Sequence, residues 1–485
     1  LTVFVYAKLW RRSDVMTDIE FYEIRYSGKP AAFLRGFRAL YLGLFFNIVI
    51  MASVTLAAIK VGNVMLNLSP LEVILIAGGV TVIYSSLGGL LGVLITDFIL
   101  FILAMLGSIA AAYYAVNLPQ IGSLQNLFSH PNVADKLSLL PDFNNWELAL
   151  TVFIIPVAVQ WWSVWYPGAE PGGGGYVAQR MLAAKNEKHA MGATLFFNFA
   201  HYALRPCPWI IVALASLIIY PELSMIKEAL PHVQESIIRH DMAYPAMLTI
   251  LPSGLLGLVI ASLIAAYMST MSTSLNWGSS YVVNDFYKRF LKPEASEKEL
   301  VFIGRLSTVF MMIIASSFAL FLESSLNAFN VLLQIGAGTG LLFILRWFWW
   351  RINAYSEITA MVVSFIIALG FLFLGNFHNE QIKILIEAGV DKVTATTQVG
   401  AFKTYEELLI GVTITTISWL VVTFTTKPAN EETLIRFCKL VKPGGMGWQK
   451  VIMNAELKGH TFSDEDKKSN LPLGILAMSV SYTHL

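Results

Sequence analysis

Charged residues are scarce in this chain of 485 residues: aspartate, glutamate, lysine and arginine together make up 13% of it. A soluble domain has about 25% charged residues, so this composition excludes an ordinary soluble globular protein. The positive and negative charges nearly cancel, to a net +1, which argues against a nucleic-acid partner. The chain has only two cysteines, Cys207 and Cys438, and their positions indicate neither a disulfide framework nor a metal site.

Hydrophobic residues are abundant instead: they make up 56% of the chain, and its mean hydropathy is +0.63. A helix that crosses a membrane needs about 20 consecutive apolar residues. Runs of this length predict about ten complete spans, near residues 39–59, 70–90, 94–116, 148–168, 191–219, 251–283, 303–322, 327–345, 356–375 and 406–426. Barrel strands are about ten residues long and alternate in polarity. The fold class predicted is therefore an all-α integral membrane protein.

The basic residues are unevenly distributed over the connections between these spans. Most lysines and arginines fall in one alternating set of connections, near residues 8–38, 180–188, 288–298, 346–351 and 427–442. The opposite set, at 117–145, 221–243 and 376–405, has few. By the positive-inside rule the first set is cytoplasmic. We therefore expect a multi-pass protein of the plasma (inner) membrane, with its large basic loops on the cytoplasmic side.

The domain organisation predicted is a single transmembrane domain over residues 1–480, with a cytoplasmic loop at 427–470. Both ends resemble incomplete helices. The chain begins with LTVFVYAKLW, and LPLGILAMSV at 471–480 has about half of the apolar residues that a span needs. Residues 481–485, SYTHL, resemble a non-native tail. We therefore expect a fragment of a longer protein.

The stretch AYMSTMSTSLNWGSS, residues 266–280, places many hydroxyl groups in a segment that is uncharged over 242–284. On a helix, one face would present Ala266, Ser269, Thr270 and Thr273, with Ser272 and Asn276 beside it. Hydroxyl and carbonyl oxygens suit a small, hard cation. Alternatively, such hydroxyls donate to the carbonyl four residues earlier or join helices. The spacing alone leaves both interpretations open.

Asp97 is the only acidic residue in the long apolar run LLGVLITDFILFILAM. An acidic residue at membrane depth is a candidate functional residue because its burial is costly. The alternative is an interfacial aspartate that caps the start of a helix. Both interpretations remain open at this point.

The segment WWSVWYPGAEPGGGGYVAQRMLAAKN, residues 161–186, contains four consecutive glycines and two prolines, which cannot continue a straight helix. Broken helices at membrane depth occur around cavities, where their backbone groups bind ligands. This segment offers aromatic faces and one carboxylate to such a cavity, at Trp161, Trp162, Trp165, Tyr176 and Glu170. A re-entrant loop with an interfacial aromatic belt is the alternative.

Two further polar pairs fall in apolar segments. His201 and Arg205 are one helical turn apart, and Arg205 could pair with Glu170 or extend to the interface. Asn330 and Gln334 are also one turn apart and precede the glycine-rich sequence GAGTG. Close helix packing explains those glycines equally well.

Five segments together resemble the sodium:solute symporter family, which includes sodium–glucose transporters and relatives for sialic acid and proline. MSTMSTSLNWGSSYVVNDFY, residues 268–287, resembles the family's Met-Ser-Ser-x-x-Ser-x-x-Asn-Ser pattern that ends in Asp-x-Tyr. Four more segments resemble family motifs in the same order: YAKLWRRSDVMTDIEFYEIRYSG, YSSLGGLLGVLITD, AQRMLAAKN and PEASEKELVFIGR. The resemblance implies a core of ten helices, built from two inverted repeats of five, with peripheral helices.

The resemblance also implies sites. It suggests a main sodium site at Ala266, Ser269 and Thr270, where Ala266 offers its carbonyl, and a second site at Asp97, Ser269, Ser272 and Thr273. Tyr176 falls where the family has an aromatic inner gate. With the residues named above, the candidate substrate-binding or gate residues are Tyr176, Trp162, Trp165, Glu170, His201, Arg205, Asn330 and Gln334. No cofactor is expected, and Na+ is the coupling ion.

The function that follows is sodium-coupled symport of a small polar solute, sugar or sugar-like, by alternating access across the plasma membrane. The protein would not be an enzyme, and its partners would be the solute, sodium ions and the lipid bilayer. A membrane sensor on the same fold, without net transport, is the alternative. The first core helix of the family is expected to be missing from the sequence. Glycines stand where the family's sugar transporters have polar side chains, so the substrate remains open.

Overall fold

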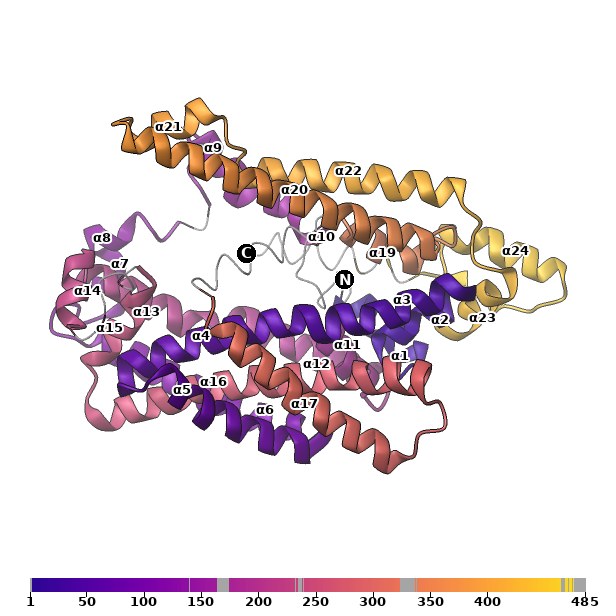
Figure 1. Cartoon of the computed structure of the whole chain (residues 1–485), viewed down its shortest axis with the longest axis horizontal. Helices are drawn as coiled ribbons and strands as arrows, with labels where there is room; N and C mark the ends of the chain where they lie inside the picture. Colours follow the sequence, from indigo (N-terminus) through magenta and orange to yellow (C-terminus); the bar gives the residue numbers. More distant parts are fainter. Residues whose placement is uncertain are drawn as a thin grey trace.

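The computed structural model describes residues 2–138, 140–163, 174–231, 240–322 and 338–463, together with 233, 238, 336, 467–469, 471, 472 and 474. Within these residues, all regular secondary structure is helical, which agrees with the predicted all-α class. Most of the long helices run along the long axis of the molecule (Figure 1).

The first half of the chain contains α1 (Ala7–Ser13), α2 (Phe21–Arg25), α3 (Gly28–Leu40), α4 (Asn47–Leu66), α5 (Pro70–Val73), α6 (Gly79–Val116), α7 (Leu124–Ser129), α8 (Pro131–Ala134), α9 (Trp146–Ala149), α10 (Trp161–Ser163), α11 (Gly175–Leu182), α12 (Glu187–Asn198), α13 (Pro206–Ile219) and α14 (Leu223–Ala229). The second half contains α15 (Ala243–Thr249), α16 (Ser253–Ser280), α17 (Glu297–Ala319), α19 (Gly340–Phe348), α20 (Ala354–Glu387), α21 (Lys392–Val399), α22 (Thr404–Thr425), α23 (Glu431–Val441) and α24 (Gln449–Leu457). Wider or tighter helical turns precede or extend several of these helices: η1 (Thr2–Tyr6), η2 (Asp18–Glu20), η3 (Tyr41–Phe46), η4 (Ile74–Gly78), η5 (Leu150–Ile154), η6 (Pro156–Gln160), η7 (Phe199–Leu204), η9 (His240–Met242), η10 (Tyr281–Leu291) and η11 (Met446–Trp448).

Seven helical segments among the described residues are long and apolar enough to cross a membrane: Gly28–Leu66, Pro70–Val116, Glu187–Ile219, Ser253–Leu291, Glu297–Ala319, Ala354–Glu387 and Tyr405–Thr425. They include eight of the ten predicted spans, because Pro70–Val116 contains two. The span predicted at 148–168 is represented by the shorter apolar segment Trp146–Gln160. Much of the span predicted at 327–345 lies outside the described residues.

The segment Pro70–Val116 is too long for a single crossing. Its 47 residues would make a straight helix about 70 Å long, more than twice the hydrocarbon core of a bilayer. The helical path is broken at Gly89, where φ is 54° and ψ is −166°. Glycine adopts such a conformation readily because it has no Cβ. The break divides the segment into two arms, which match the predicted spans 70–90 and 94–116.

The contacts with α16 show that these two arms run in opposite directions. In the second arm, Asp97 accepts a hydrogen bond from Ser269. Tyr84, thirteen residues earlier in the first arm, donates to the carbonyl of Met268, the neighbour of Ser269. On a straight helix thirteen residues span about 20 Å, which is incompatible with contacts to adjacent residues of α16. The chain therefore reverses direction at Gly89 and forms a helical hairpin.

Helix α16 packs closely against its neighbours because small residues line the contacts. A Cβ added at Gly278 would lie 2.4 Å from Nδ2 of Asn47, 2.6 Å from the carbonyl oxygen of Gly43 and 2.8 Å from Sδ of Met311. The Asn47 amide donates to the carbonyl of Ser274 at 2.7 Å. The backbone of α16 therefore approaches that of η3 closely at Gly278, and side chains of α4 and α17 fill the remaining space around this glycine.

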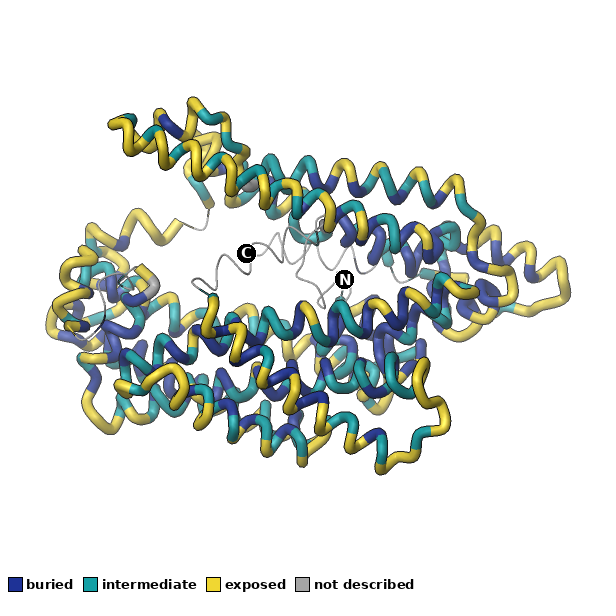
Figure 2. The backbone as a smooth tube through the Cα atoms, viewed as in Figure 1, coloured by how far each residue is buried: buried dark blue, intermediate teal, exposed yellow. Residues whose placement is uncertain are grey.

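The outer surfaces of the long helices are apolar. Figure 2 shows exposed and half-buried residues along most of their length. In the most apolar 18-residue stretch of Pro70–Val116 only 11% of residues are buried. Exposed side chains of Pro70–Val116 include Leu87, Leu91 and Phe98. Apolar surface on this scale requires an apolar surrounding, which supports a location in the membrane.

The segment predicted as a cytoplasmic loop at 427–470 contains two helices, α23 and α24. Helix α23 packs against α1 and α2 near the start of the chain, and the buried Arg25 of α2 is one of the residues at this contact. Its guanidinium donates to the carbonyls of Arg346 and Trp349, at 2.7 and 2.9 Å. It also lies 5.4 Å from the ring centre of Phe437 and 4.9 Å from that of Trp448, which are cation–π distances.

The close packing of α16 leads to a stability prediction. We expect Gly278→Ala to lower the free energy of unfolding by about 1–3 kcal/mol, because the added methyl group overlaps atoms on two neighbouring helices. Thermal unfolding of the purified protein in detergent measures this change. Gly257→Ala, on the same helix, is the matched control, since a Cβ added there would have no atom within 4 Å. Equal melting temperatures for the two variants would contradict the described packing.

Candidate functional site

Asp97 lies in the second arm of α6, and α16 surrounds its carboxylate with hydroxyl donors. Oδ1 accepts hydrogen bonds from Ser269 at 2.8 Å and Ser272 at 3.4 Å. Oδ2 accepts a hydrogen bond from Thr273 at 2.7 Å. A charged side chain at the centre of a membrane helix costs about 2.5–3.5 kcal/mol on insertion scales. These donors supply the stabilisation that an ionised carboxylate requires there.

The alternative interpretation of Asp97 as a helix cap is wrong. Helix α6 continues on both sides of Asp97, and the break nearest to it is at Gly89, more than two turns earlier. Side chains, not the backbone amides of a helix start, donate to the carboxylate.

A fourth donor to Asp97 comes from a different helix. Arg180 of α11 places Nη2 3.4 Å from Asp97 Oδ2 and 2.9 Å from Thr273 Oγ1. The charge pattern along the chain counts Arg180 with the cytoplasmic basic residues, but its guanidinium lies against an intramembrane carboxylate. The sequence prediction omits Arg180 from the site. The motif AQRMLAAKN, which follows the glycine-rich break, is the sequence feature from which a role for Arg180 could have been predicted.

Helix α11 is held to the rest of the molecule at its start and near its middle. At its start, the Gly175 amide donates to Asp18 Oδ2 at 2.8 Å, and Tyr281 donates to the other oxygen of the same carboxylate. Burial raises the pKa of the Asp18 carboxyl, and the hydrogen bonds from Tyr281 and Gly175 oppose this shift. One turn further along α11, Gln179 donates to Asn276 of α16 at 3.3 Å.

Two of the three residues predicted for the main sodium site, Ala266 and Thr270, make no described contact with Asp97. The Thr270 hydroxyl donates to the carbonyl of Ala266 at 3.0 Å, so two of the three predicted ligand oxygens are adjacent. Both residues line a cavity of about 430 Å³ between α4, α5 with its extension, and α16. Ser269, the third predicted ligand, donates to Asp97 instead. The hydroxyl face of α16 therefore serves two separate environments.

The alternative interpretation of the hydroxyls as backbone-bonded groups is partly correct. The Thr270 bond to Ala266 is a bond of this type, and Ser272 donates to the carbonyl of Ser269 at 3.0 Å. A hydroxyl that donates to a carbonyl still has lone pairs with which to bind a cation. Backbone bonding and ion binding are therefore compatible at these residues.

Of the predicted gate and substrate residues, Tyr176 lies beside the Asp97 cluster. Its ring centre is 6.4 Å from that of Trp277, in an edge-to-face arrangement. The Arg180 guanidinium lies 5.8 Å from the centre of the same ring. Tyr176 and Arg180 are one turn apart on α11, so any movement of this helix displaces both.

The described contacts of Trp162 and His201 lie outside the Asp97 cluster, whereas Arg205 interacts electrostatically with Tyr176. Trp162 donates to the carbonyl of Ala158 at 2.6 Å and packs near Val412 of α22. Arg205 and His201 are hydrogen-bonded to each other at 3.0 Å. The other predicted substrate or gate residues, Trp165, Glu170, Asn330 and Gln334, lie outside the described residues.

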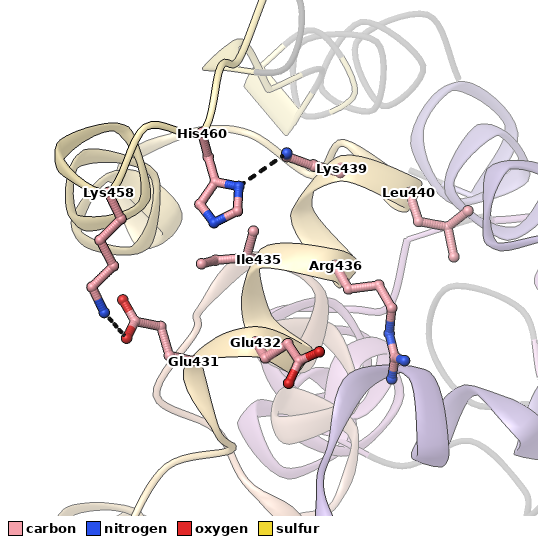
Figure 3. A pocket seen from close by; sticks show the side chains of 8 residues that line it. All are labelled: Glu431, Glu432, Ile435, Arg436, Lys439, Leu440, Lys458 and His460. Carbon is pink, nitrogen blue, oxygen red and sulfur yellow. Dashed lines mark hydrogen bonds and ion pairs between the residues drawn. The ribbon is translucent and has the colours of Figure 1, made fainter.

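A second cavity, of about 650 Å³, lies between α23 and α24, far in the chain from the Asp97 cluster. Figure 3 shows the Lys458–Glu431 ion pair on one side of it and Lys439 facing His460 on the other. None of the predicted site residues lines this cavity. In the described part of the chain no cluster of three or more histidine, cysteine or acidic side chains could hold a metal ion.

The anchoring of α11 leads to a prediction. Asp18→Ala leaves the Gly175 amide and the Tyr281 hydroxyl buried without an acceptor, so we expect the free energy of unfolding to fall by about 1–3 kcal/mol. Thermal unfolding in detergent measures the change. Asp135→Ala is the control, since the Asp135 side chain is 62% exposed. A melting temperature for Asp18→Ala equal to that of the control would show that this carboxylate does not anchor α11.

Comparison with known proteins provides independent information. The model of the sodium:solute symporter family matches residues 1–364. A sodium/glucose cotransporter of Vibrio parahaemolyticus is 27% identical over 308 residues, which cover 60% of this chain and 55% of that protein. Sodium/myo-inositol cotransporter 2 of Sus scrofa is 23% identical over 440 residues, covering 84% of this chain and 62% of that protein. This chain thus spans about half to three-fifths of the length of these two relatives.

Among solved structures, a sodium-coupled sialic acid symporter in a substrate-bound, outward-open state has a similar fold. The TM-score is 0.61 at 20% sequence identity, and the match covers 88% of this chain and 81% of the other. At this identity the likeness concerns the arrangement of the helices alone.

Proposed function

Because the chain belongs to the sodium:solute symporter family, we propose that it forms most of a transporter that couples inward sodium flow to uptake of a small polar solute. The family is one of transporters, in agreement with the prediction that the chain is not an enzyme. The observation that carries the proposal is the intramembrane carboxylate of Asp97 within hydrogen-bonding distance of three hydroxyls of α16. A negative group with several oxygen neighbours is an environment that suits a sodium ion.

We place two sodium ions on the hydroxyl helix. The main ion would bind the Ala266 carbonyl and the hydroxyls of Ser269 and Thr270. The second would bind Asp97 with the hydroxyls of Ser269, Ser272 and Thr273. The separation of these residues into two environments supports two ions more than one. Each ion that moves down a membrane potential contributes about 2.3 kcal/mol per 100 mV, so a second ion substantially increases the concentrating power.

The solute would be a sugar or a sugar-like molecule. The support is the names of the relatives, which transport glucose or myo-inositol, and the sialic acid symporter with the similar fold. Tyr176 would form the inner gate, on a helix that contacts the second ion site. We further propose two inverted repeats of five helices, a location in the plasma membrane and basic loops on the cytoplasmic side. These features are the setting for alternating access, in which sodium binding shifts the population toward the outward-open state.

A screen of uptake into proteoliposomes tests the function. The full-length protein is reconstituted, and uptake of labelled sugars, polyols, sialic acids and amino acids is compared with and without an inward sodium gradient. Uptake of at least one class should require the gradient. Sodium binding without gradient-driven uptake of any class would favour the sensor instead.

For the main ion site, we expect Thr270→Ala to weaken sodium affinity by on the order of tenfold, equivalent to about 1.4 kcal/mol. The hydroxyl next to the Ala266 carbonyl is lost, together with the γ-methyl group of an exposed side chain. The half-saturating sodium concentration for uptake measures the effect. Thr396→Ala is the control, because Thr396 lies in α21, well separated in the chain from the hydroxyl helix. An unchanged sodium requirement in Thr270→Ala would refute the assignment of the main site.

For the second ion site, we expect Asp97→Asn to lower the Hill coefficient for sodium toward one. The amide keeps the shape of the carboxylate but loses the negative charge that attracts the ion. The sodium dependence of the uptake rate measures the coefficient, with Asp14→Asn as a control at an exposed acidic residue. A coefficient equal to that of the unsubstituted protein would refute a second ion at Asp97.

A further inference from the structure

We propose that Arg180 is an exchangeable counter-ion of Asp97: a sodium ion that enters the second site displaces its guanidinium, and this displacement releases α11 from α16. The inference rests on the proposed sodium site at Asp97. It adds the residue that neutralises the carboxylate when the ion is absent, and a route from ion binding to the gate.

The four donors around Asp97 differ in how they can respond to a cation. Each of the three hydroxyls has a donor hydrogen and acceptor lone pairs, so rotation about one bond converts it from a donor to the carboxylate into a ligand of the ion. A guanidinium has five donor hydrogens and no acceptor. Arg180 therefore cannot bind sodium, although Nη2 contacts two of the oxygens that the ion would use, Asp97 Oδ2 and Thr273 Oγ1.

The charges also favour exchange over joint occupancy. Asp97 supplies a single negative charge, and the Arg180 and Asp97 side chains are only 24% and 20% exposed. Two cations beside one carboxylate would leave a net positive charge in a partly dry site, where like charges repel more strongly than in water. One cation at a time is therefore the neutral arrangement.

Arg180 retains partners when it leaves the carboxylate. Nη1 donates to the Tyr176 carbonyl and to Oε1 of Gln179, both at 3.1 Å and both on α11 itself. These two acceptors are neutral and move together with the arginine. Displacement therefore breaks only the contacts of Arg180 with α6 and α16, and the guanidinium remains hydrogen-bonded to its own helix.

The displacement acts on the gate because of what else holds α11. The helix contacts α16 through Arg180, through the uncharged bond of Gln179 to Asn276 and through the ring of Tyr176 against Trp277, and its start is held at Asp18. Loss of the charged contact leaves one neutral bond and one ring contact on the side of α11 that faces α16, and these weaker contacts alone then oppose a pivot of the helix about its anchored start. Tyr176 is one turn from Arg180 and would move with it. Ion binding would thus change the position of Tyr176 without direct contact between the ion and the ring.

Sodium binding to the purified full-length protein tests the exchange, with labelled Na+ alone as the probe. If the arginine competes with the ion, Arg180→Gln should tighten sodium binding by on the order of tenfold, the size of a moderate coupling between two sites. Arg305→Gln is the matched control, since Arg305 donates to the Ser86 carbonyl on an exposed surface, and its affinity should be unchanged. Weaker or unchanged sodium binding in Arg180→Gln would overturn the proposal.

Two further measurements separate this inference from the proposed function. Arg180→Lys retains a displaceable cation, so its sodium affinity should lie between those of the unsubstituted protein and Arg180→Gln; this variant also serves if the glutamine variant does not fold. If Asp97→Asn leaves sodium binding intact, the second site itself is wrong, whatever the arginine variants show. If Asp97→Asn loses one ion while Arg180→Gln binds sodium more weakly, only the exchange is refuted.

The release of α11 has its own readout. Val177→Cys, in a protein whose native cysteines, Cys207 and Cys438 among them, are replaced by serine, places a thiol next to Tyr176. Sodium should increase the rate at which a soluble maleimide labels this thiol, and Arg180→Gln should give the faster rate without sodium. A labelling rate that is insensitive to sodium, with the ion still bound, would show that α11 is not released.

Discussion

An ionised carboxylate within a membrane requires either a set of donors or a cation beside it, and Asp97 has this requirement in the middle of an apolar helix. The solution brings three separate parts of the chain together. The second arm of the α6 hairpin supplies the carboxylate, α16 supplies three hydroxyls, and α11 supplies a guanidinium. The Asp97 carboxylate needs one compensating positive charge. If another cation replaces the Arg180 guanidinium there, the contact of α11 with α6 and α16 through Arg180 is lost.

The helices around α16 hold the hydroxyls of the site in place. Close packing of α4, α16 and α17 around Gly278 makes these helices a rigid support for the hydroxyls. The hairpin at Gly89 returns the chain so that Tyr84 and Asp97 contact neighbouring residues of α16. Helix α11 is different: it is short, follows the glycine-rich segment and contacts α16 mainly through polar side chains and one ring. The site therefore lies between a closely packed group of helices and a short helix.

Most of the helices and one half of the site could be predicted from the sequence. Apolar runs indicate spans by length alone, and the i, i+3, i+4 spacing of Ser269, Ser272 and Thr273 places these hydroxyls on one helical face. An acidic residue in an apolar run is easily recognised, so Asp97 could also be predicted from the sequence. The spacing of residues along the chain does not show which side chain of another helix contacts Asp97. Arg180 lies next to basic residues in the chain, and only the path after the glycines directs it inward.

Trp162 illustrates the opposite difficulty. Aromatic residues in a broken helix are expected at a substrate cavity, but those on one helical segment point in several directions. The direction of Trp162 is set by its packing near Val412 of α22, a contact between residues 250 positions apart. Such a contact depends on where the later helices lie, which local sequence does not contain.

The buried arginine near the start of the chain has a consequence for how the protein could be controlled. Arg25 joins the carbonyls at the end of α19 to the rings of Phe437 and Trp448, so three distant parts of the chain share one guanidinium. A binding event or a covalent modification on the segment with α23 and α24 would therefore act directly on the connection that leads into α3. Removal of this segment would take away two of the three rings that lie against the Arg25 guanidinium among the described contacts.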